Sequence, residues 1–144
     1  MAIRFFSDDI AFKLKEKRKI ASWLKSIVLE EEKIIESINY VFVSNEAILK
    51  LNNEFLKHNY FTDILTFSHS SSALRLSGDM YISIDTVESN AIDYKVDFKN
   101  ELLRVILHGL LHLCGYKDIT KSEKKQMRKL ENKYLKKYYA ITTI

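Results

Sequence analysis

Two histidines four residues apart stand in the run His108-Gly109-Leu110-Leu111-His112-Leu113-Cys114-Gly115-Tyr116-Lys117-Asp118. On a helix that ends near residue 113, His108 and His112 lie one above the other on one face, where two imidazoles can bind one metal ion. Gly115 lets the chain leave the helix with a positive φ and turn back, which brings Asp118 toward the same ion. Three protein ligands leave a fourth position open, which is typical of catalytic rather than structural zinc. The run therefore predicts a metal site formed by His108, His112 and Asp118.

The alternative for this run is a pair of packed histidines, because a His-x-x-x-His spacing arises often by chance. The preceding segment carries an apolar stripe at helical spacing, made by Phe98, Leu102, Val105, Ile106, Leu110 and Leu113. Histidines on so apolar a helix are costly unless they have partners. Gly115 and Asp118 complete the pattern and favour the metal site. Cys114 is interpreted as a small buried apolar residue, because its helical direction points away from the two histidines.

Length and composition indicate a single domain, residues 1–144, with enough chain to bury a core. No run of about 18 apolar residues occurs, so no membrane span is expected. The N-terminus lacks the long apolar stretch of a signal peptide. Cys114 is the only cysteine, which excludes an internal disulfide. Together these features favour a cytoplasmic protein.

The net charge of +4 is concentrated near the C-terminus. Residues 121–137 contain eight basic side chains and two acidic ones, Glu123 and Glu131. A basic face attracts polyanions, of which nucleic acid is the commonest in the cytoplasm. The alternative is a solvated terminal helix with no partner.

Hydrophobic periodicity predicts an α+β fold with one mixed sheet of about four strands packed with about five helices. The strands are expected at 3–6, 37–44, 62–68 and 78–84. The helices are expected at 12–27, after a cap at Ser44, after a cap at Asp85 or Thr86, at 98–113 and at 120–138. A further short helical turn is expected near 30–36. In the second helix, Ala47, Ile48, Leu51 and Phe55 have the spacing of buried residues.

Four stretches in this order resemble the YbeY endoribonuclease / rRNA maturation factor family. They are Leu51-Asn52-Asn53, Thr62-Asp63-Ile64-Leu65-Thr66-Phe67, Gly78-Asp79-Met80-Tyr81-Ile82-Ser83 and the run from His108 to Asp118. The last is similar to the family's His-Gly-x-Leu-His-Leu-x-Gly-Tyr-Asp-His pattern and is the most specific of the four. The resemblance covers residues 39–118.

Two positions depart from the family pattern. The family's third histidine falls at Asp118, and the aspartate before it is Lys117. A carboxylate is an acceptable zinc ligand, and its harder oxygen also admits other divalent ions. The family's arginine aligns with Leu56; the neighbouring Lys57 supplies a positive charge without arginine's bidentate fork.

The resemblance implies a hydrolase: a metal-dependent endonuclease that cuts single-stranded RNA in rRNA processing and ribosome biogenesis. It implies one Zn²⁺ or another divalent ion per chain, ribosomal RNA as the RNA partner, and the ribosome or its proteins as further partners. Lys57 and Arg104 are the candidate catalytic residues that stabilise phosphate charge, and each is equally compatible with a surface or ion-paired role.

The strand residues of the resembling stretches allow two interpretations. Asp63 and Asp79 are expected either to orient a histidine or to support a strand-end turn. Phe67 and Tyr81 are interpreted as core residues rather than as residues that stack on bases.

Three other functions compete with the nuclease. A zinc peptidase shares the His-His-Gly-ligand spacing but needs a general-base glutamate where this chain has Gly109. A non-catalytic factor would use the metal for stability and the basic C-terminal face to dock on RNA or the ribosome. A plain α+β domain would contain packed histidines and no metal.

Overall fold

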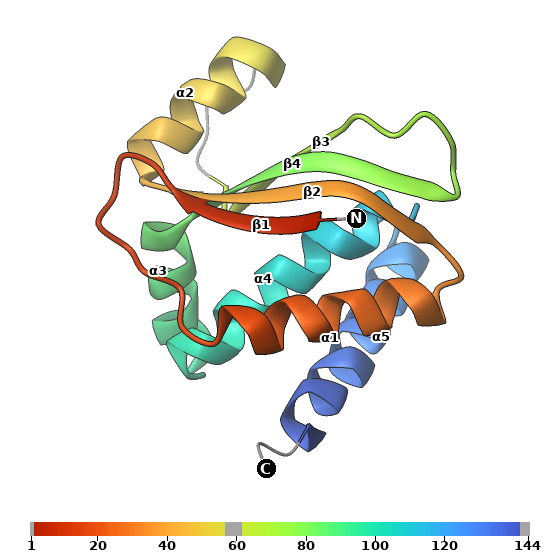
Figure 1. The fold of residues 1–144 in the computed structure, drawn as a ribbon. Helices are drawn as coiled ribbons and strands as arrows, with labels where there is room; N and C mark the ends of the chain where they lie inside the picture. Colours follow the sequence, from red (N-terminus) through yellow and green to blue (C-terminus); the bar gives the residue numbers. More distant parts are fainter. Residues whose placement is uncertain (1, 57–61, 142–144) are drawn as a thin grey trace.

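Four strands and five helices make up the described part of the chain, residues 2–56 and 62–141, in the computed structural model. In chain order they are β1 (Ala2–Ser7), α1 (Lys17–Glu30), β2 (Ile34–Val43), α2 (Asn45–Leu56), β3 (Ile64–Ser68), β4 (Arg75–Ser83), α3 (Ile84–Tyr94), α4 (Phe98–Leu113) and α5 (Lys121–Ala140). This arrangement confirms the predicted α+β class (Figure 1). None of the described helices combines the length and apolarity needed to span a bilayer.

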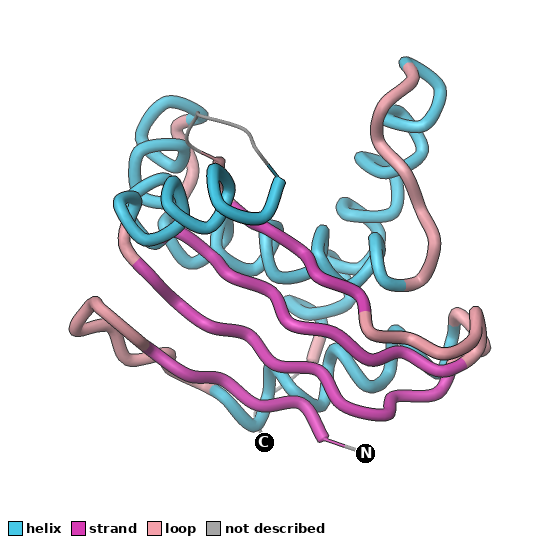
Figure 2. Tube along the Cα trace, turned by 90° about the horizontal axis from the view of Figure 1, so that it is seen from above, coloured by secondary structure: helices cyan, strands magenta, loops and turns pink. Residues whose placement is uncertain are grey.

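The strands form one mixed sheet in the order β1-β2-β4-β3. β1 pairs with β2 and β2 with β4 in parallel, whereas β3 runs antiparallel to β4 at the edge of the sheet. α1, α4 and α5 lie on one face of the sheet, and α2 stands over one end of the other face (Figures 1 and 2). The helix that carries both histidines, α4, therefore packs under β4 and the edge strand β3.

The core lies between the sheet and its helical layer. Alternate side chains of β2, those of Ile38, Tyr40 and Phe42, are buried there, as the two-residue period of a strand requires. The Tyr40 hydroxyl donates a hydrogen bond to the Ile106 carbonyl of α4 at 2.9 Å. The Trp23 indole of α1 donates to the Tyr134 carbonyl of α5 at 2.8 Å. These two bonds fix α4 and α5 relative to the rest of the fold.

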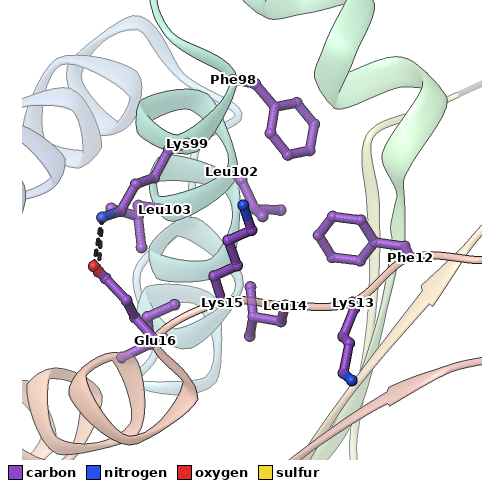
Figure 3. A pocket seen from close by; sticks show the side chains of 10 residues that line it. Phe12, Lys13, Leu14, Lys15, Glu16, Phe98, Lys99, Leu102 and Leu103 are labelled. Carbon is purple, nitrogen blue, oxygen red and sulfur yellow. Dashed lines mark hydrogen bonds and ion pairs between the residues drawn. The ribbon is translucent and has the colours of Figure 1, made fainter.

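The first helix begins at Lys17, so the prediction of helix from residue 12 was wrong. Glu16 has φ 59°, a left-handed conformation that residues inside a helix do not adopt. Phe12 packs edge-on against Phe42 and Phe98, and the Glu16 carboxylate accepts hydrogen bonds from Lys99. The segment therefore forms a wall of an apolar pocket of about 480 Å³ at the N-terminal end of α4 (Figure 3).

Other boundaries also differ from the predictions. The helical turn expected near 30–36 was wrong, because α1 ends at Glu30 and β2 begins at Ile34. The cap of α3 is Ser83, whose side chain accepts from the Thr86 amide, rather than Asp85 or Thr86. Phe55 is 61% exposed, because α2 covers only one end of the sheet. The predicted start of α5 is confirmed by a capping box between Thr120 and Glu123.

Candidate metal centre

α4 places the two histidines side by side on its last two turns. The helix runs from Phe98 to Leu113, as predicted. The imidazole side chains of His108 and His112 are 18% and 29% exposed. Their Nε2 atoms lie 2.9 Å apart. Both rings thus present the same nitrogen to one point at the helix surface.

Gly115 turns the chain back toward the histidines. Its φ is +108°, which disfavours residues with a Cβ. Its amide donates to the His112 carbonyl, and the Tyr116 amide donates to the Leu111 carbonyl, both at 3.0 Å. This pair of bonds is a Schellman motif, the common end of an α-helix. The return brings Asp118 to the histidines from beyond the helix end.

Asp118 completes a three-donor cluster. Its carboxylate oxygens lie 3.1 Å from His108 Nε2 and 3.5 Å from His112 Nε2. Among the described residues, these three form a group able to hold a metal ion. Tetrahedral zinc with bonds of about 2.0–2.1 Å separates its ligand atoms by about 3.3 Å. The separations of His108 Nε2 from His112 Nε2 and from Asp118 Oδ2 are close to this value, and one donor atom of each residue lies within 4.8 Å of the other two. Cys114 is outside the cluster.

A buried carboxylate from α5, Glu131, supports the first histidine. The side chain of Glu131 is 2% exposed, and its Oε2 accepts a hydrogen bond from His108 Nδ1 at 2.7 Å. His112 Nδ1 donates to the Tyr116 carbonyl at 2.9 Å. With both Nδ1 atoms used as donors, both Nε2 lone pairs are directed to the centre.

Glu131 was not predicted to be part of the site. A signal was present: Glu131 falls on the same helical stripe as Met127, Tyr134, Leu135 and Tyr138, all of which are buried. A carboxylate on a buried stripe needs a partner. Burial alone would raise the pKa of Glu131, but its hydrogen bond with His108 and the charges of Arg104, His108 and Arg128 hold that pKa below its ordinary value.

Arg104 is held by two carboxylates. Its guanidinium donates to Glu101 through Nε at 2.9 Å and through Nη2, and to Glu131 through Nη1 at 3.4 Å. Burial would lower the pKa of Arg104, but Glu101, Glu131 and Asp63 together raise it and keep the group charged. The guanidinium of Arg104, which was expected to stabilise phosphate charge, is thus directed at Glu101 and Glu131. Lys57, the other candidate catalytic residue, lies outside the described residues.

A cleft of about 520 Å³ opens over the cluster. One side of its lining comes from β3 and the two residues before it, that is, residues 62–66 and Ser68. The other side comes from His108, His112, Leu113 and Asp118. Burial raises the pKa of Asp63 in this lining, against the opposing charges of Arg104 and His108. The Asp63 carbonyl accepts from the Ser83 amide at 2.9 Å, which gives the residue a role at the strand end.

Neutral imidazoles suit this centre, since only an unprotonated nitrogen binds a metal. Burial, with the neighbouring His108 charge, lowers the pKa of His112. Cys114 packs half-buried against the core, and burial raises the pKa of its thiol to about 12, so a metal-binding thiolate is disfavoured.

Fold and site together define a small α+β domain with a His-His-Asp centre at the edge of its sheet. The chain belongs to the YbeY endoribonuclease family: the family model described as Endoribonuclease YbeY matches residues 3–139. A protein named Endoribonuclease YbeY from Cytophaga hutchinsonii is 45% identical over 130 residues, covering 90% of this chain and 91% of the relative. One of the same name from Parabacteroides distasonis is 39% identical over 135 residues, covering 94% of each.

A solved structure has the same fold. The solution structure of TM1509 from Thermotoga maritima superposes with a TM-score of 0.68 at 29% sequence identity. The match covers 96% of this chain and 89% of that one. The whole domain, rather than the run from His108 to Asp118 alone, is therefore shared.

Proposed function

We propose that this protein is a metal-dependent endoribonuclease that cleaves single-stranded RNA in ribosomal RNA processing and ribosome maturation. The observation that carries the proposal is the convergence of His108 Nε2, His112 Nε2 and Asp118 on an open cleft. Three protein donors at an open surface leave room for a substrate oxygen, which a closed structural site does not. The relatives named as endoribonucleases support the same reaction.

His108, His112 and Asp118 would hold one Zn²⁺ or another divalent ion. When bound, such an ion supplies a Lewis acid for phosphodiester hydrolysis. A carboxylate as the third donor is harder than an imidazole and widens the choice toward ions that prefer oxygen. The identity of the ion is therefore to be determined by measuring the metal that the purified protein binds.

The surrounding residues hold protons and charges in place. Glu131 and the Tyr116 carbonyl each keep a proton on Nδ1 of one histidine. Arg104 holds Glu131 by an ion pair, so we assign it the role of a positioning residue. Lys57 remains the proposed contact to the substrate phosphate. It supplies a positive charge next to Leu56, which occupies the position of the family's arginine.

The RNA backbone is proposed to lie against the start of α5. Lys121, Lys124, Lys125 and Arg128 are exposed there, directly after the turn that carries Asp118. Lysine and arginine side chains bind phosphates with displacement of counterions, so RNA binding should fall steeply with salt. The ribosome or ribosomal proteins as partners, and the cytoplasm as location, complete this proposal.

The closest chemical competitor, a zinc peptidase, meets a steric obstacle at Gly109. A Cβ at this position would lie 2.5 Å from Met80 Sδ and 2.7 Å from Ile64 Cδ1. α4 packs on the sheet through this glycine, so its missing side chain would point at the core. The general-base glutamate that a peptidase needs after the first histidine would therefore enter the core beside Met80 and Ile64, and these side chains would have to move to admit it.

The test combines elemental analysis with an RNA cleavage assay. We expect about one divalent ion per wild-type chain and cleavage of single-stranded but not duplex RNA. His112→Ala and Asp118→Ala should lose both metal and cleavage, whereas Asp93→Ala, an exposed carboxylate change on α3, should lose neither. Cleavage that survives in His112→Ala would exclude the proposed centre.

A non-catalytic RNA-binding factor is the second candidate, and the basic surface of α5 favours it. That function predicts metal bound by the wild type and salt-dependent RNA binding without any cleavage. The same two assays therefore separate the two candidates.

A further inference from the structure

One face of the sheet is largely uncovered by the elements that the structure describes. Sheets with parallel strands are normally covered by helices on both faces. Here β1, β2 and β4 are parallel, yet the helical layer of α1, α4 and α5 lies on one side. Of the described helices, only α2 stands on the other side (Figures 1 and 2). Seen from above, the strands of the uncovered face are open to view beside α2 (Figure 2). An exposed face of this kind is typical of a surface that binds a partner.

The pairing register shows which side chains share this face. One cross-strand row contains Arg4, Asn39, Asp79 and Phe67, and the next contains Phe6, Val41, Tyr81 and Leu65. Phe67 and Tyr81 were interpreted from the sequence as core residues. Both are only half-buried, on the face opposite to the main core, where they pack on a small cluster under α2.

Aromatic rings from β3, β4 and α2 meet on this face. The Phe67 ring lies 5.9 Å from that of Tyr81 and 6.0 Å from that of Phe55, edge to face in both pairs. They line a hollow of about 310 Å³ together with Leu51, His69 and Asp79. Exposed aromatic surface around a polar group is typical of a binding site rather than of a solvated face.

Asp79 stands in the hollow with acceptor capacity to spare. Its Oδ1 accepts from Asn39 Nδ2 at 2.9 Å, and its Oδ2 pairs with His69 Nε2 at 3.0 Å. An ionised carboxylate offers about four acceptor positions, so these two contacts, counted among the described residues, leave about two. The side chain is 34% exposed, which keeps the remaining positions accessible from the hollow.

The hollow and the metal centre are separated by a single strand. Thr66 and Ser68 of β3 line the metal cleft, whereas Phe67 between them lines the hollow on the other face. Because β3 is the edge strand, no other described strand separates the two sites. A single-stranded nucleic acid passing over this edge would occupy both.

We propose that this hollow, formed by Phe55, Phe67, His69, Asp79 and Tyr81, is a guanine-binding subsite for single-stranded RNA. The inference rests on the proposed function for its choice of RNA. Guanine has two adjacent donors, N1–H and N2–H, which match the two open acceptor positions of Asp79. Adenine places an acceptor at N1, and neither pyrimidine offers two adjacent donors on that edge. The base ring stacks on Phe67 or Tyr81, as bases do on aromatic side chains of open sheets.

Charge chemistry favours a base over the other occupants of an apolar surface. An apolar protein partner would bury the Asp79 carboxylate without new hydrogen bonds, at a high desolvation cost. A phosphate would be repelled by it. A base edge with two N–H donors satisfies the carboxylate and covers the rings at once.

Binding of short labelled RNAs tests the inference without any cleavage. The probes are UUGUUU and UUAUUU, measured by fluorescence anisotropy at low salt in the presence of EDTA. Wild-type protein should bind the guanine probe about tenfold more tightly, the discrimination expected of one bidentate base contact. Asp79→Asn keeps the size of the side chain but exchanges an acceptor for a donor, so the preference for guanine should disappear.

A second variant tests the stacking surface. Tyr81→Leu retains apolar packing and should weaken binding of both probes by about tenfold. Tyr94→Leu is the matched control, because Tyr94 is an exposed aromatic residue at the end of α3. It should bind both probes as the wild type does.

Equal affinity of wild-type protein for the two probes, or a guanine preference that persists in Asp79→Asn, would overturn the inference. If a variant does not fold, NMR titration of wild-type protein with guanosine and adenosine decides. Amide shifts at Phe67, Asp79 and Tyr81 with guanosine alone support the subsite, and their absence refutes it. Guanine preference without RNA cleavage would contradict only the proposed function, and cleavage without the preference only this subsite.

Discussion

Replacing Glu131 by glutamine tests how far a carboxylate on α5 controls the metal affinity of α4. In the native protein its oxygens face three nitrogens: His108 Nδ1 at 2.7 Å, Arg104 Nη1 at 3.4 Å and Arg128 Nη1 at 3.6 Å. Glutamine has nearly the same size and retains one acceptor. It removes the negative charge, however, and presents an amide N–H₂ to groups that are themselves donors.

The expected magnitude follows from burial. Glu131 is 2% exposed, so water screens its contacts far less than those of a surface pair. Removal of one partner from a buried ion pair costs about 3–5 kcal/mol. Arg104 keeps its contact to Glu101 and glutamine keeps an acceptor, so we expect a loss of about 2 kcal/mol in the free energy of unfolding. Metal affinity should fall by about 10- to 100-fold, as it does when the group that orients a ligating histidine is changed.

Two measurements separate these effects. Urea denaturation of metal-free protein reports stability, and competition with a chromophoric chelator reports zinc affinity. The matched control is Glu36→Gln, which removes a half-exposed carboxylate 3.8 Å from Arg75 and should change stability by less than about 1 kcal/mol. If Glu131→Gln loses stability but binds zinc as tightly as the control, the reasoning that Glu131 orients His108 is refuted.

Three further changes have defined outcomes. Gly115→Ala forces a Cβ into a backbone with φ +108°, so it should destabilise the protein by about 1–3 kcal/mol and reduce its metal content. Denaturation measures the stability and elemental analysis measures the metal. Unchanged metal content would show that the turn does not place Asp118. Exchange of Lys124 and Lys125 for glutamine should reduce the steepness of the plot of log K for RNA binding against log salt by about 1.4, without loss of metal. An unchanged slope would show that RNA does not bind to this part of α5. The hydrogen bond from Lys99, with that from Tyr138, holds the pKa of Glu16 below its ordinary value of 4.5. The stability advantage of wild type over Glu16→Gln should therefore be complete above pH 4.5 and disappear as the pH falls through the lowered pKa; urea denaturation across this range measures it, and an advantage that persists in acid would contradict the assignment.

Local sequence patterns were sufficient where the determinants of structure were local. The apolar stripe of residues 98–113 placed α4, and Gly115 placed the turn after it, because helix periodicity and a positive φ depend on nearby residues. The geometry of the three predicted donors follows from these two elements. Thr120 and Glu123 marked the start of α5 for the same reason.

The features that sequence reasoning missed depend on contacts between distant segments. Residues 12–16 have helical spacing, but Phe12 and Leu14 reach the core only in a non-helical chain that ends in the left-handed Glu16. Glu131 reaches the candidate metal centre because α5 packs across α4. Phe67 and Tyr81 pack, as half-buried residues, on the smaller cluster under α2 rather than in the main core. The alternation of a strand's two faces does not say which face the larger helical layer covers.

The position of Glu131 late in the chain also determines when the proposed metal centre can be completed. β1 and β2 pair residues 35 apart, as in Ala2 with Ser37, and β2 and β4 pair residues 40 apart, as in Asn39 with Asp79. Pairing over such separations closes longer loops than the contacts within a helix do, so we expect the sheet to form more slowly than the helices. A growing chain that has reached Asp118 already contains all three donors, but the carboxylate that holds the His108 proton is still to be synthesised. The proposed metal centre is therefore complete only when α5 has been made and has packed on α4, because only then does Glu131 orient His108.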